Sequence, residues 1–249
     1  MPTTLIFGGS GKVARQLTRQ LVAQSHTVHS IIRNPTQVSE IQSLGAKPVV
    51  QSIEESNVSQ LASTIKQCNP EIVVWSAGAG GGNPERTKTV DQEGAIKSFD
   101  ACTEAGVKRY IIVSAVDVRD RNKNSYPEWY DEESKKRSDS VWDRIGVYME
   151  AKLQADRNLR IQNGQRELHY TIVRPGGLSN EPGTGKVAAG KVGLGTMVSR
   201  EDVATVVIEC MKNDGTVGLA FDVVGGETPI QQAVKEVVDA HVDTFEGQY

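Results

Sequence analysis

Two groups of residues in this 249-residue chain could do chemistry, and the first is the glycine-rich run Gly8-Gly9-Ser10-Gly11. The run follows a short apolar segment and precedes a helix-like pattern. Such a turn leaves backbone N–H groups free at a helix start, where the helix dipole adds a positive field, so it can hold a diphosphate. We expect Gly8 to permit the tight bend and Gly11 to let a phosphate approach without a Cβ clash. The sequence therefore predicts a dinucleotide site that includes Gly8, Gly9, Ser10, Gly11, Lys12 and Val13.

The second group is Tyr148 and Lys152, which share one face if their segment is helical. A tyrosine with a pKa of about 10 is a poor acid at neutral pH. A nearby ammonium favours the phenolate, lowers this pKa and brings general acid–base catalysis within reach. Spacing alone does not separate this interpretation from an ordinary amphipathic pair.

Arg33 bears on the choice of dinucleotide. It follows the apolar run Thr27–Ile32, where a carboxylate would accept the ribose 2′-hydroxyl of NAD. A guanidinium there, with Lys12 in the glycine turn, suits the 2′-phosphate of NADP, because the guanidinium fork matches phosphate oxygens. We therefore expect NADP (NADPH) as the cofactor rather than NAD.

The elements that must position these residues alternate regularly along the chain. The pattern predicts strands at Thr3–Phe7, Thr27–Ile32, Lys47–Val50, Ile72–Trp75, Tyr110–Val113, Tyr170–Val173 and Leu219–Val223. It predicts helices at Lys12–Ala23, Thr36–Leu44, Val58–Gln67, Pro84–Ala105, Val141–Gln162, Arg200–Lys212 and Pro229–Val242. Continuous apolar strands between helices indicate an α/β fold, a Rossmann-type doubly wound parallel sheet of about seven strands with a small C-terminal substrate-side elaboration. We expect one domain over 1–249.

Two segments depart from this alternation. The stretch at about 117–140 is rich in charged and aromatic residues, including Trp129 and Tyr130, and we interpret it as a partly ordered substrate lid. The glycine-containing stretch at about 178–198 reads as a substrate-side loop that orders with ligand. The substrate pocket is expected between these two segments, and an aromatic wall there would suit a flat acceptor.

Composition excludes several classes of protein. A net charge of −3 argues against binding to nucleic acid or to an anionic membrane, and no apolar run approaches the roughly 20 residues of a membrane span. The first strand begins at about Thr3, so we expect no signal peptide. Three separate cysteines, Cys68, Cys102 and Cys210, read as reduced thiols of a cytoplasmic or nuclear protein. We expect no metal site, because the histidines lack close ligand pairing.

Several motifs occur together in a fixed order: Gly8-Gly9-Ser10-Gly11, Val90-Asp91-x2-Gly94, the run from Ala105 to Ser114, Tyr148-x3-Lys152, and the run from Tyr170 to Leu178. In this order they resemble the atypical and extended short-chain dehydrogenase/reductases. The resemblance lies in the subgroup near the NAD(P)H-binding and NmrA-like proteins and the biliverdin-IXβ/flavin reductases. It covers roughly residues 3 to 241.

The resemblance implies a sheet of order 3-2-1-4-5-6-7 and a role for each matching residue. Lys152 would hold the nicotinamide ribose, and Tyr148 would protonate the substrate oxygen. The other cofactor contacts implied are Ser52 and Ile53 at the adenine, Ala77, Gly78 and Ala79 at the ribose, Ser114 and Ala115 beneath the nicotinamide, and Pro175, Gly176, Gly177 and Leu178 around its carboxamide.

One departure from the family pattern concerns the oxyanion partner. Members with a full catalytic set carry a serine where this chain has Val116. Its part would fall to Ser114, to a group in the insertion, or to none, and Ser125 is a poor substitute because it lies inside the insertion.

The function predicted is an NADP(H)-dependent oxidoreductase of a small carbonyl, quinone or flavin-like acceptor, with Tyr148, Lys152 and Ser114 as catalytic residues. A variant without tyrosine chemistry would rely on proximity alone. A redox sensor of the NmrA-like kind is the alternative. A sugar-nucleotide epimerase or dehydratase is a weaker one, because few residues follow Arg174-Pro175-Gly176. The oligomeric state is left open between monomer and homodimer.

Overall fold

The computed structural model describes residues 1–80, 83–123 and 126–245. Its first part contains β1 (Thr3–Phe7), α1 (Lys12–Ala23), β2 (Thr27–Ile32), the short helix η1 (Pro35–Gln37), α2 (Val38–Ser43), β3 (Lys47–Val50), α3 (Val58–Cys68), β4 (Ile72–Trp75), α4 (Pro84–Thr87), the π-helix η2 (Lys88–Gly94), α5 (Ala95–Ala105) and β5 (Arg109–Val113). The second part contains α6 (Glu132–Ile161), α7 (Asn163–Arg166), β6 (His169–Pro175), β7 (Leu178–Ser179), β8 (Lys186–Gly190), β9 (Val198–Ser199), α8 (Arg200–Lys212), η3 (Asp214–Thr216), β10 (Ala220–Gly225), β11 (Thr228–Pro229) and α9 (Ile230–Asp239).

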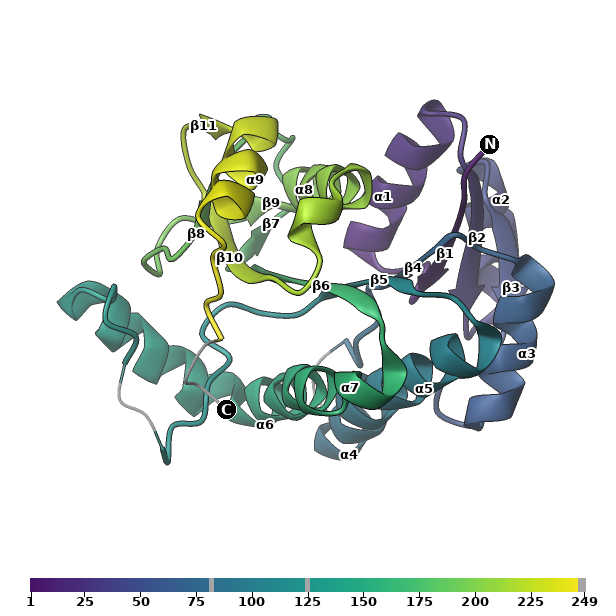
Figure 1. The fold of residues 1–249 in the computed structure, drawn as a ribbon, viewed down its shortest axis with the longest axis horizontal. Helices are drawn as coiled ribbons and strands as arrows, with labels where there is room; N and C mark the ends of the chain where they lie inside the picture. Colours follow the sequence, from purple (N-terminus) through teal and green to yellow (C-terminus); the bar gives the residue numbers. More distant parts are fainter. Residues whose placement is uncertain (81–82, 124–125, 246–249) are drawn as a thin grey trace.

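The large sheet has the order β11-β8-β10-β6-β5-β4-β1-β2-β3. From β3 to β10 all neighbours are parallel, which confirms the predicted doubly wound order. Strands β8 and β11 extend this sheet antiparallel to it. The central strands are apolar along their length because helices cover both of their faces (Figure 1).

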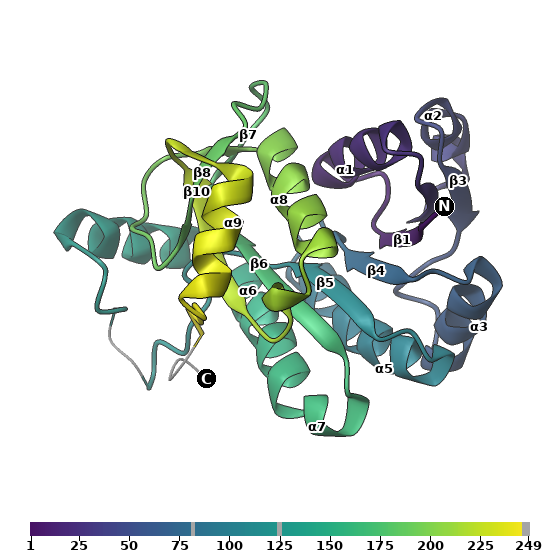
Figure 2. The ribbon, with the colours of Figure 1, turned by 45° about the horizontal axis from the view of Figure 1, so that its top comes forward.

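Helices α1, α2, α8 and α9 lie on one face of the sheet, and α3 to α7 lie on the other (Figures 1 and 2). Two hydrophobic cores result, one on each side. Leu17, Leu21 and Val207 belong to the first core. Trp75 and Phe99 belong to the second. The sheet is therefore packed between two layers of helices, and the loops that follow its strands project from their carboxyl ends.

The structure corrects three boundaries. The helix expected from Val141 begins at Glu132, because the Asp131 side chain accepts a hydrogen bond from the backbone N–H of Ser134 at 2.7 Å and caps the helix. The helix is broken at Ile145 (φ −131°, ψ 29°). The single helix expected over 84–105 is interrupted by the π-helix at Lys88–Gly94.

The third correction concerns the stretch at 178–198, which we expected to be a loop. It contains β8, which together with β11 makes the large sheet wider than the seven strands expected, and it contains β7 and the first residue of β9, which pair in a separate two-stranded sheet. The insertion at 117–140 is partly regular, as expected, because its last residues form the start of α6.

A buried arginine at the end of β6 ties the sheet to the end of the chain. Arg174 donates hydrogen bonds to the carbonyls of Ala115 (3.1 Å), Val118 and Thr244 (3.1 Å), and it lies 3.6 Å from an oxygen of buried Asp222. Burial, only partly opposed by Arg174, raises the pKa of Asp222 to about 7. Arg174 therefore fixes the backbone that follows β5.

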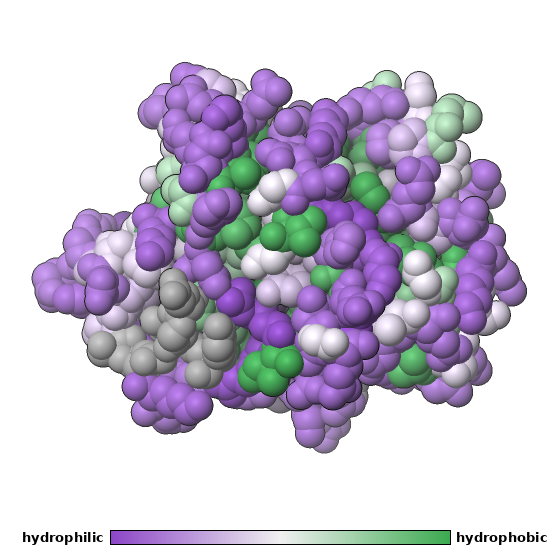
Figure 3. Space-filling model, in the orientation of Figure 1, coloured by the Kyte–Doolittle hydropathy of each residue, from purple (hydrophilic) through white to green (hydrophobic). Residues whose placement is uncertain are grey.

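Within the described residues, none of the helices combines the length and the apolar character needed to cross a membrane. The face seen in Figure 3 is largely hydrophilic, and its hydrophobic residues form separate patches.

Gly8 provides a test of the turn geometry. Its φ is +76°, and a Cβ there would lie 2.5 Å from the Cα of Ala77. We expect Gly8→Ala to lower the free energy of unfolding by about 2–5 kcal/mol, since left-handed strain adds to the clash.

Gly106 is the matched control, because its φ is +78° but a Cβ there would meet nothing within 4 Å. Gly106→Ala should cost only about 1 kcal/mol. Urea denaturation measures both, and equal losses would refute the clash.

Candidate active site

The carboxyl ends of the parallel strands open into a long cleft. One part, of about 300 Å³, begins at Gly8 and reaches Arg33. A second part, of about 690 Å³, contains Tyr148 and Lys152. The two parts meet at Gly11, Ser76, Ala77 and Gly78. The topology therefore brings the glycine turn and the Tyr148–Lys152 pair into one continuous site, where open α/β sheets bind their ligands.

The glycine turn has the geometry of an anion site. Gly11 is the N-cap of α1. Within the part of the chain that the structure describes, no side chain caps this helix, and no acidic residue lies in its first turn. The first N–H groups of α1 are therefore available to a ligand. Gly8, Ser10 and Gly11 line the cleft, whereas Gly9 faces β2, where a Cβ would lie 2.5 Å from that of Ser30.

At the far end of the cleft, two arginines share one carboxylate. Arg33 Nη1 lies 2.8 Å from Glu54 Oε2, and Arg86 Nε lies 3.1 Å from Glu54 Oε1. Arg86 also donates to the carbonyl of Ala79 at 2.6 Å. Lys12, which the sequence analysis pairs with Arg33, lines the other part of the cleft. The second cation beside Arg33 is thus Arg86, which no sequence signal singled out.

The family pattern implies that Ser52 and Ile53 both flank the adenine, but only one of them lines the cleft. Ile53 lines the cleft beside Arg33. The Ser52 hydroxyl accepts a hydrogen bond from the backbone N–H of Glu55 at 3.2 Å, and Ser52 is not among the lining residues.

Tyr148 and Lys152 lie on one face of α6, and the Lys152 Nζ is 5.5 Å from the centre of the Tyr148 ring. Burial alone lowers the pKa of Lys152, but the charges of Tyr148, Asp91 and Asp156 outweigh it and raise the pKa, so the ammonium stays protonated. Burial raises the pKa of Tyr148, and Lys152 opposes this only in part. The net lowering expected from the sequence is therefore wrong for this structure, and Tyr148 holds its proton at neutral pH.

Asp91 is a functional neighbour that the sequence analysis did not assign to the site, although it stands in the Val90-Asp91 motif. It lies on the π-helix η2 and is 1% exposed. Its Oδ1 lies 3.3 Å from the Lys152 Nζ, and its Oδ2 accepts a hydrogen bond from the Ala79 backbone N–H at 2.8 Å. Asp91 thus holds both the ammonium and the loop after β4.

The Ser114 hydroxyl is hydrogen-bonded to a buried carboxylate. This hydroxyl donates to Asp156 Oδ2 at 2.6 Å, and Asp156 follows Lys152 by one turn of α6. Burial raises the pKa of Asp156 to about 6, against the opposing charges of Arg174 and Lys152. The sequence did not distinguish Asp156 from the other charged residues of this long helix, so its contact with Ser114 was not predicted.

The substrate side of the cleft is lined by the residues after β5 and β6: Ala115, Val116, Pro175, Gly176, Gly177 and Leu178. The aromatic pair Trp129 and Tyr130 packs ring against ring at 6.1 Å and does not line the cleft. Trp142 lines an adjoining pocket that shares Arg144, Ile145 and Tyr148 with the cleft. Ser125 lies outside the described residues.

These features fit a dinucleotide. The uncapped helix start can take a diphosphate, and the cleft is continuous from Arg33 to Tyr148. At Gly78, a Cβ would stand 3.1 Å from Asp91 Oδ1, so a side chain there would crowd that carboxylate. The fold and the site together define a Rossmann-type nucleotide-binding protein.

Comparison with known proteins narrows this class. Residues 8–214 match the model of the NAD(P)H-binding family, and the chain belongs to that family. It is similar to the UPF0659 protein C216.03 of Schizosaccharomyces pombe, with 36% identity over 94% of each chain. It is also similar to YhfK of Bacillus subtilis, which is named an uncharacterized sugar epimerase, with 33% identity over 93% of this chain and 98% of the relative.

A solved structure from Bacillus halodurans, provisionally named an NAD-dependent epimerase/dehydratase, aligns with a TM-score of 0.77 and 32% identity. The alignment covers 95% of this chain and all of the other. The family and the fold expected from the sequence are thereby confirmed, and the chain is oxidoreductase- or epimerase-like.

Asp156 allows a test of the buried charges by pH. Because its pKa is raised in the folded protein, its contribution to the free energy of unfolding is complete below the pKa of an unfolded aspartate, about 4, and is lost as pH rises through about 6. Between pH 4 and pH 7 the wild type should lose about 2 kcal/mol relative to Asp156→Asn. Urea denaturation across this range measures the difference. Asp143→Asn, an exposed change on the same helix, should show no such trend. If both variants follow the same curve, Asp156 is not the titrating group.

Proposed function

We propose that this protein is an NADP(H)-dependent oxidoreductase that transfers hydride to a small carbonyl, quinone or flavin-like acceptor. The observation that carries the proposal is the position of Tyr148. It stands in the same cleft as the glycine turn, one helical turn before a buried, protonated Lys152 that Asp91 holds in place. A tyrosine in this setting can give a proton to an oxygen that gains negative charge.

Bound NADPH supplies the hydride and its two electrons. As the acceptor carbon gains the hydride, the electron pair of its C=O bond moves onto oxygen, and the Tyr148 hydroxyl donates its proton there. The phenolate left behind faces the Lys152 ammonium, which stabilises it until a proton returns from solvent. Asp91 keeps the ammonium in position, and Ser114 remains bonded to Asp156 beside the reacting atoms.

We infer a preference for NADP(H) over NAD(H) from the two arginines at the far end of the cleft. Arg33 and Arg86 converge on Glu54, and a 2′-phosphate could replace that carboxylate as their shared partner. Glu54 itself opposes the phosphate by like charge. The strength of the preference then depends on how readily Glu54 turns away.

The names of the relatives give a second candidate, an epimerase that uses its cofactor without net consumption. The same tyrosine–lysine pair would serve it. A cofactor-binding sensor without turnover is the third. Steady consumption of NADPH separates the first function from the other two.

The central experiment compares the wild type with Tyr148→Phe. NADPH oxidation against a panel of quinones, flavins, aldehydes and ketones should be detectable in the wild type. In the variant it should fall by a factor of about 10²–10⁴, because the proton donor is lost. NADPH binding, followed by fluorescence, should be unchanged.

Other outcomes would point elsewhere. Turnover retained in Tyr148→Phe would indicate hydride transfer driven by proximity alone. Tight NADPH binding without oxidation by any acceptor would contradict the reductase, and interconversion of a sugar nucleotide without net NADPH loss would establish the epimerase.

The cofactor preference can be tested in both directions. Arg33→Ala should weaken NADPH binding by about tenfold, because one charge-assisted contact is lost, and it should leave NADH binding unchanged. Glu54→Gln should strengthen NADPH binding, because it keeps the shape of the side chain but removes the opposing charge. Titration calorimetry with both nucleotides measures this. An equal effect of Arg33→Ala on NADPH and NADH would show that Arg33 does not contact the 2′-phosphate.

A further inference from the structure

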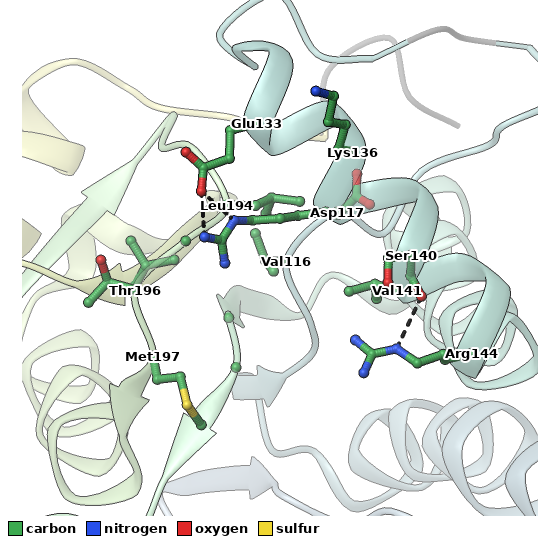
Figure 4. A pocket seen from close by; sticks show the side chains of 15 residues that line it. Val116, Asp117, Glu133, Lys136, Ser140, Val141, Arg144, Leu194, Thr196 and Met197 are labelled. Atoms are coloured by element: carbon green, nitrogen blue, oxygen red, sulfur yellow. Dashed lines mark hydrogen bonds and ion pairs between the residues drawn. The ribbon is translucent and has the colours of Figure 1, made fainter.

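An outer pocket of about 760 Å³ adjoins the site on the substrate side (Figure 4). The first half of α6 forms one wall, and residues 194–197 face it across the opening. The pocket shares Val116, Val141, Arg144, Gly176 and Gly177 with the part of the cleft that holds Tyr148. A molecule that reaches Tyr148 can therefore extend into the outer pocket.

Both carboxylates that line this pocket are already paired. Glu133 accepts two hydrogen bonds from Arg137, at 2.5 and 3.1 Å. Asp117 is buried, lies 3.0 Å from Arg119, and accepts a hydrogen bond from the indole N–H of Trp142 at 3.1 Å. Neither carboxylate is available to neutralise a further cation.

Arg144 is a cation that the outer pocket shares with the cleft of Tyr148. It directly precedes the break in α6 at Ile145. Its Nε donates to the carbonyl of Ser140 at 3.2 Å. Among residues 1–80, 83–123 and 126–245, no carboxylate lies within ion-pair distance of its guanidinium. In Figure 4 the guanidinium points from α6 toward the opening, whereas Lys136 reaches away from it.

Apart from the charged residues and the hydroxyls of Ser140 and Thr196, the lining of the pocket is apolar. Val116, Val141 and Leu194 line it, and Met197 stands at its edge with 56% of its surface exposed. Ile145, 46% exposed, lies next to Arg144 in the adjoining cleft. Large exposed apolar side chains beside an unneutralised guanidinium favour a ligand with a hydrophobic body and one anionic end.

We propose that the substrate is an apolar, ring-containing acceptor that carries a carboxylate, and that Arg144 binds this carboxylate and so determines specificity. This inference rests on the proposed function for the position of the reacting group near Tyr148. The carboxylate lies toward the outer pocket, and the planar guanidinium takes it by paired N–H···O hydrogen bonds. The ring system lies between the aliphatic walls formed by Val141 and Met197.

The test is a binding measurement that requires no turnover. Naphthylacetate and the uncharged naphthylacetamide have the same ring and nearly the same shape. Titration calorimetry in the presence of NADP⁺ should show that the wild type binds the acid about tenfold more tightly than the amide, as expected for one charge-assisted contact. Arg144→Gln should abolish the difference while leaving the amide affinity unchanged.

Lys135→Gln is the matched control. It removes the same charge from the same helix, at a side chain that pairs with Glu132 and does not line the pocket. The control should keep the preference for the acid. Equal binding of the two probes by the wild type, or an equal loss in Lys135→Gln and Arg144→Gln, would overturn the proposal.

The two proposals fail separately. A retained preference for the acid with no NADPH oxidation would support the carboxylate site and overturn the reductase. Turnover of neutral quinones by a protein that binds both probes equally would overturn the carboxylate site alone.

Discussion

The arrangement of the site depends on one buried ion pair, between Lys152 on α6 and Asp91 on the π-helix η2. An ammonium without solvent stays charged only beside opposite charge and hydrogen-bond acceptors. Asp91 meets this need and also binds the backbone N–H of Ala79, while Ala79 accepts a hydrogen bond from Arg86. The long helix, the loop after β4 and the arginine at the far end of the cleft are therefore linked through a single side chain. The wider turn of the π-helix supports this, since such local departures from α geometry are frequent at functional sites.

Much of the fold follows from local sequence. The seven parallel strands were predictable because apolar runs such as Thr3–Phe7 and Tyr110–Val113 are covered on both faces. The glycine turn was predictable because Gly8 adopts a conformation that other residues disfavour. The start of α6 was not predictable, because its first turns are charged and only the Asp131 cap defines where the helix begins. Strand β8 pairs antiparallel with β10, which is more than 30 residues away, and no local pattern encodes that contact. The contacts of Glu54 with Arg33 and Arg86 are equally long-range, so the sequence showed the cations but not the carboxylate between them.

The comparisons with known proteins identify the family of this chain, whereas the local chemistry of the site bears on the reaction and the substrate. This chain belongs to the NAD(P)H-binding family, yet of two relatives at 33–36% identity over nearly the full chain, one has a name that states no reaction and the other is named an uncharacterized sugar epimerase. This is expected where a common scaffold supplies the cofactor site and variable segments supply the rest. Here the segments around the outer pocket are the first half of α6 and residues 194–197, which are joined by a hydrogen bond from the Leu194 backbone N–H to the Ser134 hydroxyl at 3.0 Å. Differences in substrate within the family should therefore concentrate in these two segments.

Arg174 joins parts of the chain that are made at very different times. Its guanidinium contacts Ala115 and Val118 after β5, but it also needs the carbonyl and hydroxyl of Thr244, and Asp243 adds an ion pair with Arg160 of α6. During synthesis, the nucleotide-binding half can form its local contacts long before residue 244 leaves the ribosome. The segment after β5 cannot reach its final hydrogen bonding until Asp243 and Thr244 have left the ribosome. The nascent protein should thus pass through a stage in which the cofactor half is complete and the substrate half is still open.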